Sequence, residues 1–138
     1  MHVLVIDGQG GGIGRQLVAL IKAELPGVTV NAVGTNSAAT AAMLKAGAES
    51  GATGENAVIV GCRRADVIVG PVGVVIADAL NGEISPAMAL AAAQSPAKRI
   101  LLPFNHCDNL IVGVSDFNPT TLVRNAVAEL KRIIEERA

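Results

Sequence analysis

The sequence predicts a three-layer α/β domain, in which helices cover both faces of a mostly parallel five-stranded sheet. Short apolar runs such as Val3–Ile6 and Val67–Val69 are typical of strands that are buried on both faces. Apolar residues at helical spacing follow the first run, at Ile13, Leu17 and Ile21. Strands and helices alternate along most of the chain, which is the order that parallel strands with crossover helices require.

The length of 138 residues predicts one domain that spans residues 1–138. Hydrophobic residues make up 51% of the chain and charged residues only 17%, against about 25% charged in a typical protein. This deficit of charge predicts that other copies of the chain cover part of the surface, so we expect a homo-oligomer. The alanine-rich segment Ala87–Ala93 is expected to form part of the contact.

Composition also excludes several classes of partner. The chain has two Phe, no Trp and no Tyr, and its net charge is −1, so neither base stacking nor a basic surface favours nucleic acid. No apolar run approaches the ~20 residues of a membrane span. The absence of a signal peptide and the two cysteines predict a cytoplasmic protein. No C-x-x-C or H-x-x-x-H motif is present, so no metal site is expected.

The N-terminal half predicts two strand–helix pairs and a third helix. In order, these are strand Val3–Ile6, a helix from Ile13 that ends at Pro26-Gly27, strand Val28–Val33, helix Ala38–Ala46, a polar, glycine-rich break at Glu49–Gly54 and a helix to about Arg64. The last helix has an alternative, because Val58–Val60 would also suit a strand.

The C-terminal half predicts three strands and two helices: strand Asp66–Gly70, helix Ala87–Gln94 with Ser85-Pro86 at its start, strand Arg99–Phe104, strand Asn109–Val114 and helix Thr120–Arg137. Four residues separate the last two strands, which is too few for a parallel crossover. We therefore expect the last strand to be antiparallel. The favoured strand order is 2-1-3-4-5, a Rossmann-like or flavodoxin-like sheet with its switch point between strands one and three.

Five glycines lie within the seven residues Gly8–Gly14, between the first strand and the first helix. Glycine lets the backbone approach a ligand closely, and a helix N-terminus favours an anion. The loop therefore predicts a small phosphate-bearing ligand, such as a nucleotide or a dinucleotide like NADP. In the alternative, the glycines only form a tight turn.

The predicted strand order brings three glycine-containing turns to one edge of the sheet. The expected binding residues are Asp7, Gly8, Gln9, Gly10, Gly11, Gly12, Ile13, Gly14 and Arg15, then Gly34, Thr35, Asn36 and Ser37, then Gly70, Pro71 and Gly73. The second turn has no acidic residue to hold a ribose 2′-hydroxyl. Either the ligand carries a 2′-phosphate, or it is not a dinucleotide, or these residues merely cap the helix.

Two residues are candidates for catalysis. Asp7 ends the first strand beside the glycine loop, where its carboxylate could either hold a metal, a ribose or a proton, or accept loop N–H groups and fix the turn. Cys107 lies in Asn105–Asp108 beside His106 and is a candidate nucleophile. Alternatively it is a link residue or a subunit contact, because a catalytic Cys and His normally meet in space and not in sequence.

The spacing Gly8-x-x-x-Gly12-Ile13-Gly14 resembles the loop of short-chain dehydrogenases. That resemblance implies that Gly8 forms the tight turn, Gly12 lies under a pyrophosphate and Gly14 packs against the helix. The chain has no Tyr, so it lacks the catalytic Tyr of those enzymes.

A second resemblance extends over most of the chain and is based on Ile6–Gly14, Gly34–Ser37, Met43–Ala48, Gly51–Asn56 and Gly82–Ile84. These segments resemble a family of small bacterial proteins that is catalogued as a domain of unknown function. The resemblance implies one domain in a bacterial cytoplasm and no particular activity. The sequence thus favours a nucleotide-binding or phosphate-binding module. The alternatives are a small enzyme that acts on a phosphorylated or carboxylated metabolite, and a structural subunit without a ligand.

Overall fold

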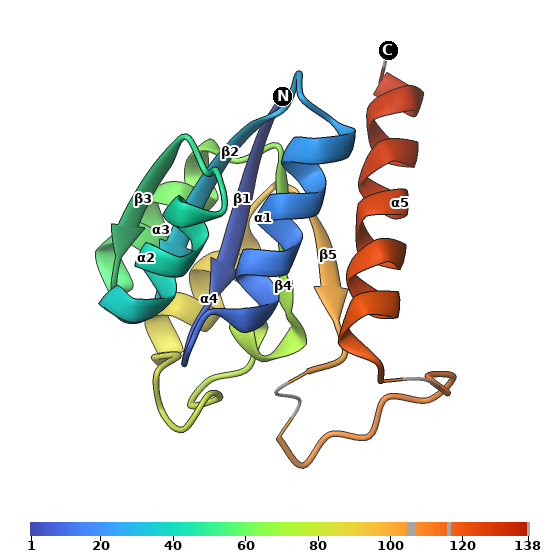
Figure 1. Cartoon of the computed structure of the whole chain (residues 1–138). Coiled ribbons are helices and arrows are strands. Elements are labelled where there is room, and N and C mark those ends of the chain that lie inside the picture. Colours follow the sequence, from blue (N-terminus) through green and yellow to red (C-terminus); the bar gives the residue numbers. More distant parts are fainter. Residues whose placement is uncertain (105–106, 116, 138) are drawn as a thin grey trace.

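Five parallel strands form the middle layer of the computed structural model, which describes residues 1–104, 107–115 and 117–137 (Figure 1). The strands are β1 (His2–Asp7), β2 (Thr29–Gly34), β3 (Ser50–Thr53), β4 (Val67–Pro71) and β5 (Lys98–Leu102). Their order in the sheet is β3-β2-β1-β4-β5, and each neighbouring pair is parallel. The apolar β1 therefore lies at the centre.

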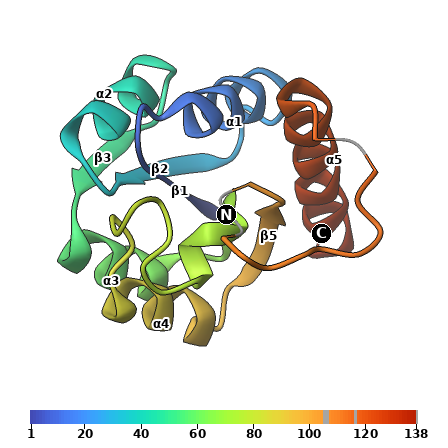
Figure 2. The same cartoon turned by 90° about the horizontal axis from the view of Figure 1, so that it is seen from below.

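Helices cover both faces of this sheet (Figure 2). One face carries α1 (Gly12–Glu24), α2 (Ser37–Lys45) and α5 (Pro119–Arg137), and the other carries α3 (Glu55–Arg64), α4 (Pro86–Gln94) and the short 3₁₀ helix η1 (Val72–Val75). Alternate residues of β1 point to opposite faces. Val3 and Val5 pack with α1 and α5, and Leu4 and Ile6 pack with α3 and α4. This alternation divides the core into two layers.

The predicted fold class is confirmed: this is a three-layer α/β fold with a five-stranded Rossmann-like sheet. The first four predicted strands lie in the expected relative order. The chain leaves β1 toward β2 and β3, then crosses to β4 and β5, so the switch point lies between β1 and β4.

The predicted break at residues 49–54 is wrong, because residues 50–53 form the edge strand β3. Its backbone pairs with β2 from Asn31 to Gly34. All four residues of β3 are exposed. An edge strand that buries no side chain has no apolar alternation, so the sequence pattern gave no indication of it.

The predicted last strand, Asn109–Val114, is also wrong, and with it the expected antiparallel pairing. These residues form turns and irregular backbone. The alternating Leu110 and Val112 that favoured a strand are 91% and 96% exposed. Gly113 has a φ of +91°, a left-handed conformation that interrupts an extended chain.

Two helix starts are capped as their residue types predict. The Asn36 side chain accepts a hydrogen bond of 2.9 Å from the N–H of Ala39 in α2. The Ser85 hydroxyl accepts one of 3.2 Å from the N–H of Met88 in α4, directly before Pro86. Both caps fix helices whose N-termini lie at the carboxyl edge of the sheet.

Candidate functional site

The Gly8–Gly14 loop connects the end of β1 to the first turn of α1. The N–H of Gly11 donates a hydrogen bond of 2.9 Å to the carbonyl of Gly8. Gly11 has a left-handed φ of +73°, a backbone conformation in which a residue with a side chain would be strained. The turn leaves a shallow hollow of about 260 Å³, lined by residues 7–13, Gln16 and Pro119 at the start of α5.

Asp7 is buried at the inner side of this hollow. Its Oδ2 accepts a hydrogen bond of 2.6 Å from the N–H of Gly14, in the first turn of α1. Burial raises the pKa of Asp7, and the nearby charge of Glu83 adds to that rise, while the N–H groups of Gly14 and Gly8 oppose it. Asp7 therefore fixes the loop, as one of its two predicted roles requires, and it also lines the hollow.

Three of the glycines are required by close packing. A Cβ on Gly8 would collide with the Thr35 hydroxyl, and one on Gly11 would lie 2.9 Å from the Cα of Ala39. A Cβ on Gly14 would lie 2.6 Å from Sδ of Met43 and 2.8 Å from Cβ of Asp7. These glycines let α1 and α2 approach the end of β1 closely.

Gly10 and Gly12 differ from the other three. A Cβ on either residue would meet nothing within 4 Å, and neither residue has a left-handed φ. Within the described part of the chain, the N–H groups of Gly10, Gly12 and Ile13 donate no hydrogen bond. The rim of the hollow therefore offers three backbone donors that no hydrogen bond among the described residues uses.

Glu83 is a site residue that the sequence analysis missed. It lies between η1 and α4, and its Oε1 accepts hydrogen bonds from the Gln9 N–H at 2.9 Å, the Thr35 hydroxyl at 2.5 Å and Nδ2 of Asn36 at 2.8 Å. The bond from Thr35, together with those from Gln9 and Asn36, lowers the pKa of Glu83. No local motif marks Glu83, because only the folded topology brings it to the ends of β1 and β2.

The polar side chains of the second predicted turn form hydrogen bonds with other residues of the protein. Thr35 and Asn36 bind Glu83, and Nδ2 of Asn36 also donates to the Gln9 carbonyl at 2.8 Å. A Cβ on Gly34 would collide with Thr40, and Ser37 is exposed in the first turn of α2. The helix-capping alternative for Asn36 is confirmed, and the turn also joins two loops.

The remaining predicted binding residues do not line the hollow. Arg15 is exposed and lines a separate groove between α1 and α5. A Cβ on Gly70 would collide with the Ile6 carbonyl, so that glycine lets β1 and β4 approach. Pro71 ends β4, and Gly73 lies in η1, where its N–H donates to the Phe104 carbonyl at 3.4 Å.

A family model described as "Domain of unknown function (DUF3842)" matches residues 2–135. This chain belongs to the DUF3842 family. None of the curated proteins matches the chain in sequence. Among solved structures, the chain is similar to a dodecameric FMN-dependent Ubix-like decarboxylase from Escherichia coli O157:H7, with 17% identity and a TM-score of 0.49. That alignment covers 95% of this chain and 76% of the decarboxylase chain.

The cysteines of this DUF3842 protein occupy different environments. Cys107 is exposed with a φ of +55°, and its predicted neighbours Asn105 and His106 lie outside the described residues. Cys62 is buried in the core between α3 and α4, and burial raises the pKa of its thiol to about 11. The Cys62 thiol is therefore protonated at neutral pH.

Residues 1–104, 107–115 and 117–137 contain no group of three His, Cys, Asp or Glu side chains that could hold a metal ion. They also contain no helix that is both long and apolar enough to cross a membrane.

Proposed function

We propose that this chain binds a small phosphate-bearing ligand, of the nucleotide class, in the hollow over Gly10 and Gly12. The observation that supports the proposal is that a side chain would fit without a clash at both Gly10 and Gly12. Neither packing nor backbone conformation requires glycine there, and Gly12 is the first residue of α1, a helix that alanine would favour. A side chain at either position would stand in the hollow and hold a ligand away from the backbone donors.

Backbone donors would bind the phosphate. The N–H groups of Gly10, Gly12 and Ile13 lie at the N-terminus of α1, a helix of 13 residues whose dipole favours an anion. Asp7 already accepts the N–H of Gly14 on the inner side. The ligand would therefore use the outer donors, beside a carboxylate that disfavours concentrated negative charge. This favours phosphates with one charge each, as in a dinucleotide.

Glu83 favours a ligand with a free ribose hydroxyl. Rossmann domains place an acidic residue at the end of the second strand, where it accepts a hydrogen bond from the ribose. Glu83 supplies a carboxylate at that place from a distant loop, and its three hydrogen bonds all fall on Oε1. Its Oε2 would repel a 2′-phosphate. We therefore propose NAD as the ligand in place of NADP, which the lack of an acidic residue in the second turn indicated from the sequence.

Calorimetry tests the proposal with ATP, ADP, NAD, NADP and FMN. We expect NAD to give the tightest binding, and Gly12→Val to weaken it at least about tenfold by filling the hollow. Gly27→Val is the matched control, because Gly27 also has open space and no left-handed φ but lies in the turn between α1 and β2. Absence of heat with all five nucleotides would contradict the proposal and leave the loop as a turn.

A second candidate function is that of a small enzyme with Asp7 as general acid or base. Asp7 lines the hollow, and its raised pKa is a property common among catalytic carboxyl groups. Once a ligand is known, Asp7→Asn distinguishes the two functions. An enzyme would lose turnover and keep its affinity, whereas a binding module would have no turnover to lose.

We also propose that the chain assembles with copies of itself through α4. This helix is rich in alanine and exposes Leu90, whose side chain is 55% accessible. Small residues allow close approach of a second helix, and Leu90 supplies apolar area to bury.

A further inference from the structure

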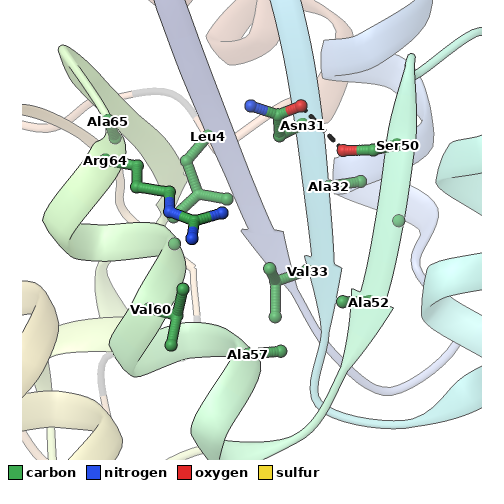
Figure 3. Close-up of a pocket in the computed structure, with 12 residues that line it drawn as sticks. Leu4, Asn31, Ala32, Val33, Ser50, Ala52, Ala57, Val60, Arg64 and Ala65 are labelled. Carbon is green, nitrogen blue, oxygen red and sulfur yellow. Dashed lines mark hydrogen bonds between the residues drawn. The ribbon is translucent and has the colours of Figure 1, made fainter.

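Another concave surface lies on the opposite face of the sheet from α1. It is a groove of about 280 Å³ between α3 and the strands β2 and β3 (Figure 3). Val33 and Ala52 form its floor at one end, where Ala57 and Val60 of α3 form the wall. None of these residues lines the glycine hollow, so the groove is independent of the proposed nucleotide site.

The other end of the groove is polar, and a positively charged side chain lies next to it. Asn31 and Ser50 are paired in the register of β2 and β3, and the Ser50 hydroxyl donates to Oδ1 of Asn31 at 2.7 Å. That bond leaves Nδ2 of Asn31 as a donor. The guanidinium of Arg64, the last residue of α3, lies over the middle of the groove in Figure 3, between Asn31 and Val33. Within the described residues, Arg64 makes no hydrogen bond and no ion pair.

Asn31 is unusual for its position. Residues 31 and 33 of β2 point to the same face of the sheet, and Val33 belongs to the core on that face. A polar amide beside a strand edge would cost stability if a helix covered it, unless it were hydrogen-bonded. Here the groove leaves the amide accessible, so Asn31 accepts a structural bond from Ser50 and keeps Nδ2 as a donor that no described residue uses.

We propose that this groove binds a small monocarboxylate with a short aliphatic tail. The planar guanidinium of Arg64 matches a carboxylate with two parallel donors, and Nδ2 of Asn31 adds a third. The tail would lie along Val33 and Ala52 toward α3. The volume of about 280 Å³ is slightly below the ~300–1,000 Å³ of typical ligand pockets, so only a short tail would fit.

Titration with hexanoate and with 1-hexanol, followed by the amide NMR signals of the protein, tests this proposal. We expect millimolar hexanoate to shift the signals of Gly51 and Gly61, which line the groove, and 1-hexanol to shift them far less. Arg64→Gln should weaken hexanoate binding at least about tenfold, since it removes a charge-assisted contact. Ala52→Leu should also weaken binding by filling the apolar end.

Arg63→Gln is the matched control. Arg63 is the exposed neighbour of Arg64 in the last turn of α3, so both variants lose the same favourable charge at a helix C-terminus, but Arg63 does not line the groove. Equal effects of the two variants would overturn the proposal. Equal shifts with hexanoate and 1-hexanol, or no shift at Gly51 and Gly61, would also overturn it. The proposal would also be overturned if sedimentation showed a homodimer that the Ala52→Leu substitution dissociates.

Discussion

Glycine serves different purposes at neighbouring positions of the Gly8–Gly14 loop. We expect Gly12→Ala to keep or raise the free energy of unfolding, by up to about 1 kcal/mol, because alanine favours a helix and meets open space there. Gly14→Ala should lower it by about 1–3 kcal/mol, because the new Cβ would overlap Met43 and Asp7. Differential scanning calorimetry measures both. A Gly12→Ala variant as unstable as Gly14→Ala would refute this distinction.

The Asp7 side chain fixes the loop by accepting the Gly14 N–H, but its negative charge is unfavourable in a buried site. Burial raises its pKa above the unfolded value of 3.8, so the folded protein holds the proton more tightly. The stability that Asp7 contributes therefore falls as the pH rises from about 3.8 through the folded pKa. In Asp7→Asn, the amide oxygen can still accept the Gly14 N–H and carries no charge.

We therefore expect Asp7→Asn to unfold at a higher denaturant concentration than the wild type at neutral pH. The difference should shrink below pH 3.8, where the wild-type carboxyl group is protonated. An Asp7→Asn variant that is less stable than the wild type at neutral pH would contradict this prediction. It would show that the hydrogen bond from the Gly14 N–H to the charged carboxylate stabilises the protein by more than burial of the charge costs.

At the scale of elements, Glu83 ties the segment between η1 and α4 to the ends of β1 and β2. Its pKa is lowered from 4.5, so its contribution to stability is complete above about pH 4.5 and is lost as the pH falls through the folded pKa. Glu83→Gln should lower the free energy of unfolding at neutral pH by about 1 kcal/mol, a small value because the side chain is partly exposed.

Hydrogen exchange at single amides tests the contribution of Glu83 to local stability. The Gln9 amide, which donates to Glu83, should exchange faster in Glu83→Gln. The same change at Glu135, an exposed glutamate of α5, should leave both exchange and stability unchanged. Unaltered exchange at Gln9 in the Glu83 variant would mean that the loops are held by other contacts.

The elements also show which features of the sequence predict structure. Strands such as β1 and β4 bury both faces, so their apolar runs indicate them clearly. The exposed β3 has no such pattern and was missed, and the exposed Leu110 and Val112 suggested a strand that does not form.

The glycine loop and Asp7 could be found locally, because a strand, a glycine turn and a helix follow one another in sequence. Glu83 lies 48 residues beyond Thr35, its hydrogen-bond partner. No periodicity could show that these two meet. The same holds for the groove beneath Arg64, whose residues come from four elements of the chain.

At the scale of the whole molecule, the low charge content and the exposed Leu90 predict self-association through α4. Sedimentation velocity at micromolar concentration should show an oligomer for the wild type and a smaller species for Leu90→Lys. Leu44→Lys changes a similarly exposed leucine of α2 and should leave the assembly intact. A monomeric wild type, or an oligomer that Leu90→Lys leaves unchanged, would contradict this prediction.

Amide NMR of the glycine loop during titration with NAD tests the central claim most directly, because it observes the proposed donors one by one. We predict that the N–H signals of Gly10, Gly12 and Ile13 shift on binding. The N–H of Gly14, which already donates to Asp7, should shift much less. If none of these signals moves with NAD, NADP, ATP, ADP or FMN at millimolar concentration, the loop is a turn and the proposed function is wrong.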